Sequence, residues 1–600
     1  MPFSVQQYWV LYVRYLRPLK HKVLLLGLLI LATNGLQIIN PQIVRYFIDQ
    51  ATAGGGGRGL WITAVFFIIG AVLLQLVGVA ATYVGEDVGW QSTNQLRADL
   101  ARHCLGLDMQ FHHEHTPGVM IERVDGDVAD IAVFFAQFVI RILGNLLLLV
   151  SIIVVLLWVD WRISLFLLLF AAVSLLIMSG LRRIAVPHWK ASREANATLF
   201  GFLEEQLAGT EDIRSSGAVG YVLRNLFRLS RTRIAAEIKA ATMGFVVFGS
   251  WITMGNVGRA LSLLVGYFLF REGTLTLGSV YLVVQYMDTI LNPLRQIADQ
   301  LQNLQKATAS IERVHELLQV QSGIVDSGEQ LVEMGRGQTR TNADDMPLAV
   351  QFDEVVFGYQ LADPVLKGIS FTLEPGEVLG VLGRTGSGKT TITRLLFRLY
   401  DVQAGQIRLG AGAMAVPLPA IPLHDLRQRV GMVTQDVQLF QASVRDNLTF
   451  FDRTISDEQI LQIIGELGLQ NWYNTLSHGL DTVLETEGTS LSAGEGQLLA
   501  FTRVFLKNPG LVILDEASSR LDPATERLIE RAVDKLLHNR TGIIVAHRLT
   551  TVHRADKIMV LGNGRILEHD TYANLAHNPD SHFAELLRTG LEAESVQVSK

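Results

Sequence analysis

The sequence has little charge, a single cysteine and no excess of basic residues. Charged residues make up 18% of the 600 residues and hydrophobic ones 49%, a charge content that is low for a soluble protein and typical of one lying partly in a membrane. The net charge of −6 argues against a nucleic-acid-binding protein, which would need a basic face. Cys104, the single cysteine, has no partner for an intrachain disulfide.

Long apolar segments fill the first half of the chain and are missing from the second. A helix needs about 20 apolar residues to cross the hydrocarbon layer, because each residue rises 1.5 Å and all backbone polar groups must be paired within the helix. We therefore expect a six-helix transmembrane domain over residues 23–320, preceded by an interfacial helix over residues 1–22. The six segments, some only just long enough, are residues 23–44, 60–83, 142–159, 163–180, 240–270 and 275–293.

The connections between these segments alternate between short and long. The short ones, residues 51–59, 160–162 and 271–274, fit tight turns on one side of the membrane. The long ones, residues 85–140 and 181–239, carry many Arg and Lys residues, which places them on the cytosolic side. Their apolar residues recur at helical spacing, so we expect cytosolic helical extensions that reach a second domain. Ordinary connecting loops are the alternative.

Two charged residues interrupt the last pair of apolar segments. An ionisable group at membrane depth is costly and marks a functional hypothesis by default. If the turn lies near Gly273, Arg259 and Asp288 lie at matching depths, each about 21 to 23 Å along its helix. Two interpretations stay open: an ion pair that holds a helical hairpin together, or a pair lining a substrate cavity.

After a polar linker over residues 321–347, the chain contains a phosphate-binding motif. Residues 383–390 match G-x-x-x-x-G-K-[ST], between an apolar strand-like run and a helical stretch. In such a loop the backbone N–H groups approach phosphate and the helix N-terminus favours the anion. We expect Lys389 to reach the β and γ phosphates and Thr390 to hold Mg²⁺. The candidate phosphate-binding residues are Gly383, Arg384, Thr385, Gly386, Ser387, Gly388, Lys389, Thr390 and Thr391.

A second apolar run ends in two carboxylates. Residues 511–514 fit a buried parallel strand, which would deliver Asp515 and Glu516 to the edge of the sheet where ligands bind. We expect Asp515 to organise Mg²⁺ and Glu516 to polarise the attacking water. His547 follows another apolar run and would lie at a neighbouring strand end, within reach of the γ phosphate. A lone histidine there would more often be structural.

The order of these motifs resembles that of the ATP-binding cassette (ABC) proteins. Tyr359 is similar to the aromatic residue that stacks on adenine, and Gln435 to the Q-loop glutamine that also contacts Mg²⁺. His547 is similar to the switch histidine. Leu491-Ser492-Ala493-Gly494-Glu495 resembles the signature LSGGQ, and residues 519–522, ending in Asp522, resemble the D-loop.

Six membrane segments ahead of one cassette resemble the type IV exporter arrangement. The resemblance implies a multi-domain fold: an all-α six-helix transmembrane domain, an α/β P-loop nucleotide-binding domain over residues 348–590 and a tail over residues 591–600. It also places coupling helices at residues 108–115 and 209–217.

The signature motif departs from the family pattern at two positions. The family has glycine where this chain has Ala493 and glutamine where it has Glu495; an added methyl crowds the backbone and an added negative charge opposes a triphosphate. Cassettes of this family pair head to tail, with ATP between the phosphate loop of one and the signature of the other, here Ser492 to Glu495. We therefore favour a heterodimer with a second half-transporter over a homodimer.

The motifs predict ATP hydrolysis, with ATP and Mg²⁺ as cofactors, coupled to membrane transport by alternating access. We expect export of a small amphiphilic substrate, either a drug, a lipid or a peptide, across the plasma or inner membrane, with the cassette in the cytoplasm. The alternatives are an inward-acting carrier or lipid flippase of the same architecture, or an ATP-gated switch without net transport. Glu516 and His547 weigh against a switch, because binding alone needs no hydrolytic base.

Overall fold

The computed structural model divides the chain into two compact units, which are described separately. The helical unit comprises Met1–Gly106 and Thr116–Val320, and the α/β unit comprises Leu107–His115 and Gln321–Lys600. The structure describes residues 13–54, 56–137, 142–326, 346–360, 362–411, 415–434, 437–484, 491–515, 523–546 and 549–588. The expected N-terminal segment and the linker are thus described only in part, and the expected tail lies outside the described residues.

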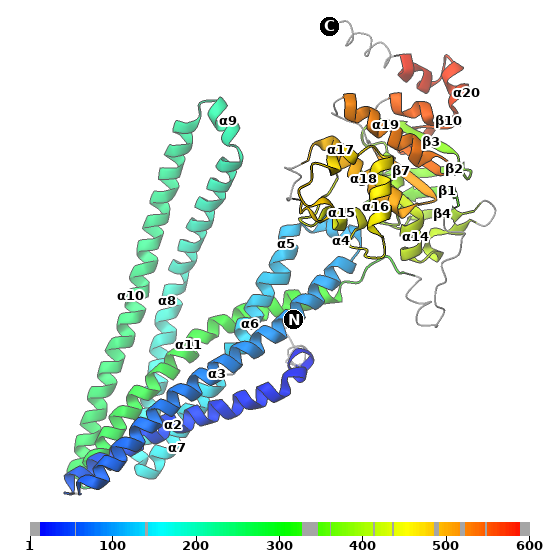
Figure 1. The fold of residues 1–600 in the computed structure, drawn as a ribbon. Coiled ribbons are helices and arrows are strands. Elements are labelled where there is room, and N and C mark those ends of the chain that lie inside the picture. The colour runs from blue at the N-terminus through cyan, green and yellow to red at the C-terminus, as the bar shows by residue number, and fades with distance from the viewer. Residues whose placement is uncertain are drawn as a thin grey trace. The chain divides into compact units, whose positions relative to one another are not determined.

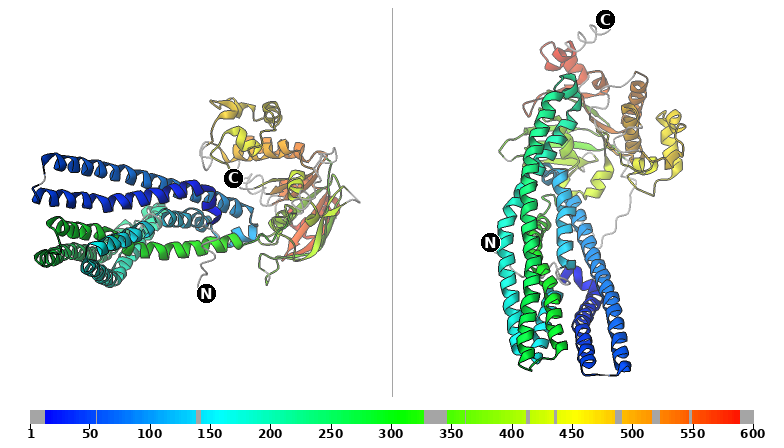
Figure 2. Two further views of the ribbon diagram at one scale, coloured as in Figure 1. Left: turned by 90° about the horizontal axis from the view of Figure 1, so that it is seen from below. Right: turned by 90° about the vertical axis from the view of Figure 1, so that its left-hand side faces the viewer.

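The helical unit consists of long helices joined by short turns. Figures 1 and 2 show α2 beside α3, and α8 beside α10, as antiparallel pairs. Each of the six expected membrane segments overlaps one of the principal helices, which are α2 (Lys20–Thr52), α3 (Gly57–Gly106), α7 (Gly144–Val159), α8 (Trp161–Ala208), α10 (Val219–Arg271) and α11 (Leu277–Gln319). The shorter elements are η1 (Arg17–Leu19), α5 (Pro117–Ile121), the π-helical η2 (Glu122–Asp127), α6 (Val128–Gln137) and α9 (Thr210–Ser215).

Four of these helices are long and apolar enough to cross a membrane, namely those over Val13–Thr52, Gly57–Gly106, Trp161–Ala208 and Val219–Arg271. A helix of 50 residues such as α3 is about 75 Å long, well beyond the ~30 Å of the hydrocarbon layer. In the described part of the chain α7 is apolar but has only 16 residues. The lengths of the four longer helices agree with helices that continue past the membrane.

Helix α11 was expected to be a membrane segment, but its composition is too polar for that criterion within the described residues. Its position explains this. Leu282, Val283, Tyr286, Met287 and Ile290 are all almost completely buried in the core of the helical unit, where they pack against α7 and α8. A membrane helix enclosed by other helices meets little lipid, and polar side chains are tolerated where such helices pack together.

Close packing of α10 against its neighbours depends on a glycine. A Cβ atom on Gly258 would lie 2.0 Å from Met287 Cε and 2.8 Å from the ring of Phe170. Small residues allow membrane helices to approach closely in this way. The backbone of α10 is therefore held against α11 and α8 at the position next to Arg259.

The α/β unit contains two sheets surrounded by helices (Figure 1). Its strands are β1 (Ala349–Phe357), β2 (Leu366–Leu373), β3 (Val378–Gly383), β4 (Ala404–Gly410), β5 (Val416–Pro417), β6 (Val430–Val433), β7 (Leu511–Asp515), β8 (Thr541–Val545), β9 (Lys557–Gly562) and β10 (Arg565–Thr571). Its main helices are α4 (Met109–Glu114), α13 (Lys389–Leu396), α14 (Leu423–Arg429), α15 (Val444–Thr449), α16 (Asp457–Glu466), α17 (Gln470–Tyr473), α18 (Ala493–Lys507), α19 (Pro523–Leu537) and α20 (Tyr572–His577).

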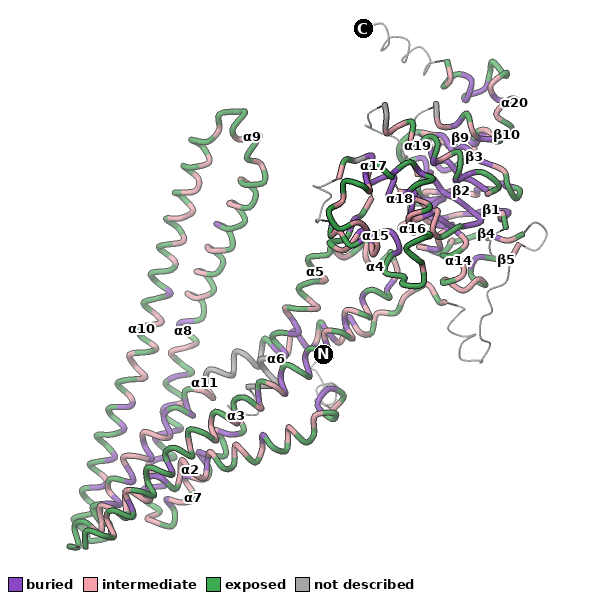
Figure 3. Tube along the Cα trace, viewed as in Figure 1, coloured by how far each residue is buried: buried purple, intermediate pink, exposed green. Residues whose placement is uncertain are grey.

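The larger sheet has the strand order β10-β9-β3-β8-β7-β6, and all its pairings are parallel except β10 with β9. The smaller sheet, β2-β1-β4-β5, is antiparallel. Strand β7 is buried on both faces, as parallel strands usually are. Leu511 and Ile513 join the cluster shared with the smaller sheet, while Val512 and Leu514 join the cluster under α18 and α19. Figure 3 shows the buried residues concentrated on these strands.

Candidate functional site

The phosphate loop lies between β3 and α13, as the sequence predicts. Gly388 has φ 107°, a conformation that side chains disfavour, and a Cβ there would lie 2.5 Å from Leu366 Cδ2. The side chain of Lys389 is buried and curls back over the loop, where Nζ donates to the backbone oxygen of Gly383 at 2.7 Å and of Arg384 at 3.2 Å. The loop thus holds a cation in front of the N-terminus of α13.

Two further atoms of the loop fit a phosphate ligand. Ser387 Oγ is buried and has no hydrogen-bond partner among the described residues, an arrangement that is costly unless a ligand or water supplies one. Thr390, at the start of α13, is exposed. A buried unsatisfied hydroxyl, an ammonium group and the N–H groups of a helix start together fit the polyphosphate of a nucleotide.

Tyr359 lies beyond the end of β1 and is surrounded by polar and aromatic groups. Its hydroxyl is 3.3 Å from Thr391 Oγ1 and accepts from Arg394 Nη1 at 3.0 Å. The Arg394 guanidinium carbon is 5.7 Å from the centre of the Tyr359 ring. Sequence analysis did not identify Arg394, although it lies on the expected helix after the phosphate loop. Its contact fixes the ring in a defined orientation.

Two other aromatic residues support Tyr359. Phe357 and Tyr400 both meet its ring edge to face, at centroid distances of 5.3 Å and 5.2 Å. Burial raises the pKa of the Tyr400 hydroxyl, which stays protonated and donates weakly to the backbone oxygen of Met109 at 3.4 Å. The aromatic group expected to stack on adenine is thus part of a packed cluster.

The larger sheet brings the carboxyl ends of four strands that precede predicted motifs to one edge. Strands β3, β8, β7 and β6 are neighbours and parallel, so their carboxyl ends lie together. Asp515 ends β7 opposite Val545 of β8, and Leu514 is opposite Val433 of β6. The phosphate loop follows β3 at the same edge. The predicted residues Gln435, Glu516, Asp522 and His547 lie outside the described residues, but the first, second and fourth follow directly or closely on β6, β7 and β8.

The signature segment forms the start of α18. Ser492 is the N-cap residue and forms a reciprocal capping box with Glu495, in which each side chain bonds the backbone N–H of the other. Gly494 is buried, and Ala493 begins the helix. The signature motif is therefore a well-formed helix N-terminus.

Arg503, which sequence analysis missed, connects α18 to the segment after β6. Its guanidinium donates to the backbone oxygens of Asn447 at 2.7 Å and Gln438 at 3.0 Å. Burial lowers its pKa to about 10, so it remains charged at neutral pH. Only the folded structure shows this role, because the two acceptors lie 56 and 65 residues away in sequence.

The two segments expected to be coupling helices are both short helices. Helix α4 groups with the α/β unit: its N-cap Asp108 accepts from the backbone N–H of Gly323 at 2.7 Å, and the ring of His113 lies 6.0 Å from that of Tyr359. Helix α9 groups with the helical unit and is exposed at all but Ile213.

Arg259 and Asp288 form the ion pair that their matching depth predicts. Arg259 Nε donates to Asp288 Oδ1 at 2.6 Å, and Arg259 Nη1 donates to Asn256 Oδ1 at 3.1 Å. The pair is not enclosed, since the side chains are 50% and 33% exposed in the single chain. A charge exposed at this depth is expected to face water or a partner chain and not lipid.

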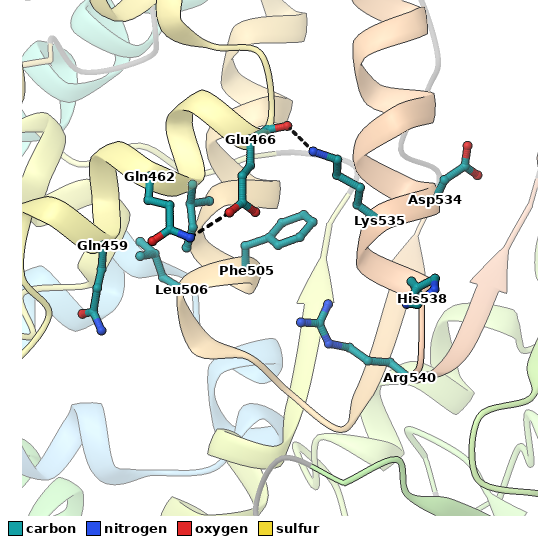
Figure 4. A pocket seen from close by; sticks show the side chains of 10 residues that line it. Gln459, Gln462, Glu466, Phe505, Leu506, Asp534, Lys535, His538 and Arg540 are labelled. Atoms are coloured by element: carbon teal, nitrogen blue, oxygen red, sulfur yellow. Dashed lines mark hydrogen bonds between the residues drawn. The ribbon is translucent and has the colours of Figure 1, made fainter.

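A cavity of about 800 Å³ in the α/β unit lies apart from these motifs (Figure 4). It opens between α16, α18 and α19. Lys535 Nζ donates to the backbone oxygen of Glu466 at 2.7 Å, and the Glu466 carboxylate accepts from Gln462 at 2.9 Å. Asp534 is paired with Arg554. None of the residues that line it belongs to the phosphate loop or the signature, so we assign it no part in nucleotide binding.

Comparisons with known proteins agree with this site. The ABC transporter transmembrane region model matches residues 23–294, and the ABC transporter model matches residues 366–519. An ATP-dependent lipid A-core flippase of Alcanivorax borkumensis is 27% identical over 581 residues, which cover 96% of each protein. A fatty acid ABC transporter ATP-binding/permease protein of Mycobacterium bovis is 29% identical over 485 residues, which cover 80% of this chain and 74% of that protein.

The fold also matches a solved structure, that of a bacterial Atm1-family ABC exporter with ATP bound. The TM-score is 0.76 at 23% identity, and the match covers 95% of this chain and 98% of that one. A half-transporter implies a dimer in a lipid membrane. The chain belongs to the ABC transporter family as an exporter-type half-transporter, in which a helical transmembrane domain is followed by an α/β domain that binds ATP and couples its hydrolysis to transport.

Proposed function

We propose that this chain is one subunit of a heterodimeric exporter of an amphiphilic substrate, in the plasma or inner membrane with its ATP-binding domain in the cytoplasm. The main support is a contrast within the α/β unit. The phosphate loop holds a buried lysine ready for an anion, whereas the signature helix begins with a carboxylate, Glu495, where the family has a neutral amide. The relatives' names, for a fatty acid and for lipid A-core, support an amphiphilic cargo.

In this proposal Tyr359 stacks on adenine and residues 383–391 bind the phosphates. Thr390, Gln435 and Asp515 would hold the cofactor Mg²⁺, because hydroxyl, amide and carboxylate oxygens are its preferred ligands. It would neutralise phosphate charge during hydrolysis. Glu516 polarises the attacking water and His547 contacts the γ phosphate. Asp522 belongs to the D-loop at the boundary between the two subunits.

The partner's signature completes the site that contains Glu516, and the signature of this chain, Ser492 to Glu495, completes the second site. The exposed surface of α9 supports a partner chain that covers it. The many Arg and Lys residues around α9, among them Arg214 and Arg224, support a cytoplasmic location for this end of the helices.

Arg259 and Asp288 line the substrate cavity in this proposal. The pair is partly exposed at membrane depth, and Asn256 adds a third polar group beside it. A site with one cationic and one anionic group suits the polar end of an amphiphile, while apolar side chains around it suit the remainder.

The experiment is to measure ATP hydrolysis by the chain in lipid nanodiscs, alone and co-purified with a second half-transporter encoded beside it. Each preparation is compared with its Glu516→Gln variant, which keeps the size of the side chain and removes the base. We expect activity only with the partner, and a loss of at least about 100-fold in the variant.

Robust Glu516-dependent hydrolysis by the chain alone would show a homodimer and contradict the asymmetry. Hydrolysis by the pair that survives the Glu516→Gln change would show that the working site does not use this residue.

A further inference from the structure

The Glu495 carboxylate binds two donors at the start of its own helix. Its Oε2 atom accepts from the backbone N–H of Ser492 at 2.7 Å and from the Ser492 hydroxyl at 2.9 Å. Ser492 Oγ in turn accepts from the backbone N–H of Glu495 at 3.2 Å. The hydroxyl proton of the signature serine is therefore committed to a carboxylate within the same chain.

A second helix of the same unit shows what a neutral residue does in this position. Helix α16 begins with the same capping box, in which Ser456 is the N-cap residue and Gln459 stands in place of the glutamate. Gln459 Oε1 accepts from the Ser456 N–H at 3.2 Å, and Ser456 Oγ accepts from the Gln459 N–H at 3.3 Å. Among the described residues the Ser456 hydroxyl donates to no acceptor. Glutamine thus caps the helix and leaves the serine proton available.

This difference bears directly on nucleotide binding. A helix N-terminus attracts an anion through its N–H groups and its dipole, and a carboxylate at the first turn already satisfies part of that attraction. Glutamine in this place offers an N–H₂ group to a phosphate, whereas glutamate offers only acceptors. Ser492 is exposed in the single chain, on the face that the family's dimer turns toward the partner's ATP.

We propose that Glu495 is an internal competitor of the ATP γ phosphate. Its carboxylate holds the hydroxyl and the backbone N–H of Ser492 at the start of α18, and ATP bound to the partner's phosphate loop must displace it before these two donors become available. This inference rests on the proposed function in that it requires a second site completed by this signature. Glu495 is thereby the residue that makes one of the two sites in the dimer bind ATP weakly.

The test is equilibrium binding of Mg²⁺ and β,γ-imido-ATP, which is not hydrolysed, to the full-length chain with its partner in nanodiscs. Nucleotide bound per dimer is counted against concentration. We expect two phases in the wild type, and in Glu495→Gln a shift of the weaker phase to about tenfold lower concentration, the size of one partly screened charge contact.

The matched control is Gln459→Glu, which makes the reverse change in the capping box of α16 and is expected to leave both phases unchanged. Glu495→Ala separates a competitor from a ligand, because removing a competitor tightens the weaker phase whereas removing a ligand weakens it. Glu495→Ala also removes half of the capping box of α18. The thermal unfolding midpoint of the nucleotide-free variant measures how much stability this loss costs.

An unchanged or weakened second phase in Glu495→Gln would overturn the inference. A homodimer would give a single binding phase, which would contradict the heterodimer. If Glu495→Gln then shifted that phase to lower nucleotide concentration, the competitor role of Glu495 would still be supported. Hydrolysis independent of Glu516 would overturn the proposed catalytic role without affecting this binding measurement.

Discussion

The helical unit exposes large apolar side chains along most of its length, whereas the α/β unit buries most of them in two clusters on either side of its larger sheet (Figure 3). In the helical unit, Leu24, Phe66 and Leu76 are each at least 60% exposed. The same unit encloses polar groups: Ser262 and Asp127 are almost completely buried. The difference shows that one chain is folded for two solvents, because apolar surface is favourable against lipid and unfavourable against water.

The largest effect is expected from breaking an ion pair of the helical unit in which the acidic partner is buried. Arg313 Nε donates to Asp127 Oδ2 at 2.9 Å, and the Asp127 side chain is only 2% exposed. Hydrogen bonding to Asp127 raises the pKa of Arg313. Arg313→Ala leaves the buried Asp127 carboxylate without this partner, so we expect a loss of about 3 kcal/mol in the free energy of unfolding. The thermal unfolding midpoint in nanodiscs measures it.

The control for this change is an ion pair in water. Lys190 and Glu194 are 3.8 Å apart on α8 and about 70% exposed. Glu194→Ala is expected to change the free energy of unfolding by less than about 0.5 kcal/mol. Equal losses in the two variants would contradict the interpretation that burial makes the Asp127 pair important.

The second prediction compares one substitution, valine to arginine, at an exposed position in each of the two units. Val72 of α3 is 53% exposed near the middle of an expected membrane segment, and Val416 of β5 is 42% exposed in the α/β unit. Arginine at the centre of a membrane helix costs about 2 to 3 kcal/mol, whereas arginine at a water-exposed position costs within about 0.5 kcal/mol. We expect Val72→Arg to lower the thermal midpoint and the yield of folded protein, and Val416→Arg to leave both unchanged. An unchanged midpoint and yield in Val72→Arg would mean that Val72 does not face lipid or a partner helix.

The smallest effect concerns the exposed ion pair at membrane depth. Removing either side chain, by Arg259→Ala or Asp288→Ala, is expected to raise the substrate concentration for half-maximal stimulation of ATP hydrolysis about fivefold, the size of one polar contact. Arg162→Ala is the matched control, because Arg162 pairs with Glu272 at 2.9 Å with similar exposure at the turn end of the helices. If the apparent affinity for the substrate is the same in all variants, Arg259 and Asp288 do not line the substrate cavity. The pair then only holds the helical hairpin together.

Features that depend on neighbouring residues could be predicted from the sequence. The strand, phosphate loop and helix around Lys389 follow from local periodicity and glycine placement, and the structure has them where expected. Arg259 and Asp288 could be paired by counting residues from the turn, since a helical hairpin with a short connection has regular geometry. The position of α11 inside the helical unit could not be predicted in this way, because the hydropathy of a segment does not show whether other helices enclose it.

The sequence by itself determined the order of the motifs, the division into an apolar and a charged half, and the altered signature, because these are properties of composition and spacing. Only the tertiary structure decided which distant groups meet: Arg394 beside Tyr359, Arg503 on the backbone of Gln438, and Asp127 with Arg313, which lies 186 residues away. It also showed that Glu495 binds Ser492, since the rotamer of a side chain at a helix start depends on the donors around it. The physical reason is that contact energies act through space, and spacing along the chain does not specify which side chains the folded backbone brings within hydrogen-bonding distance.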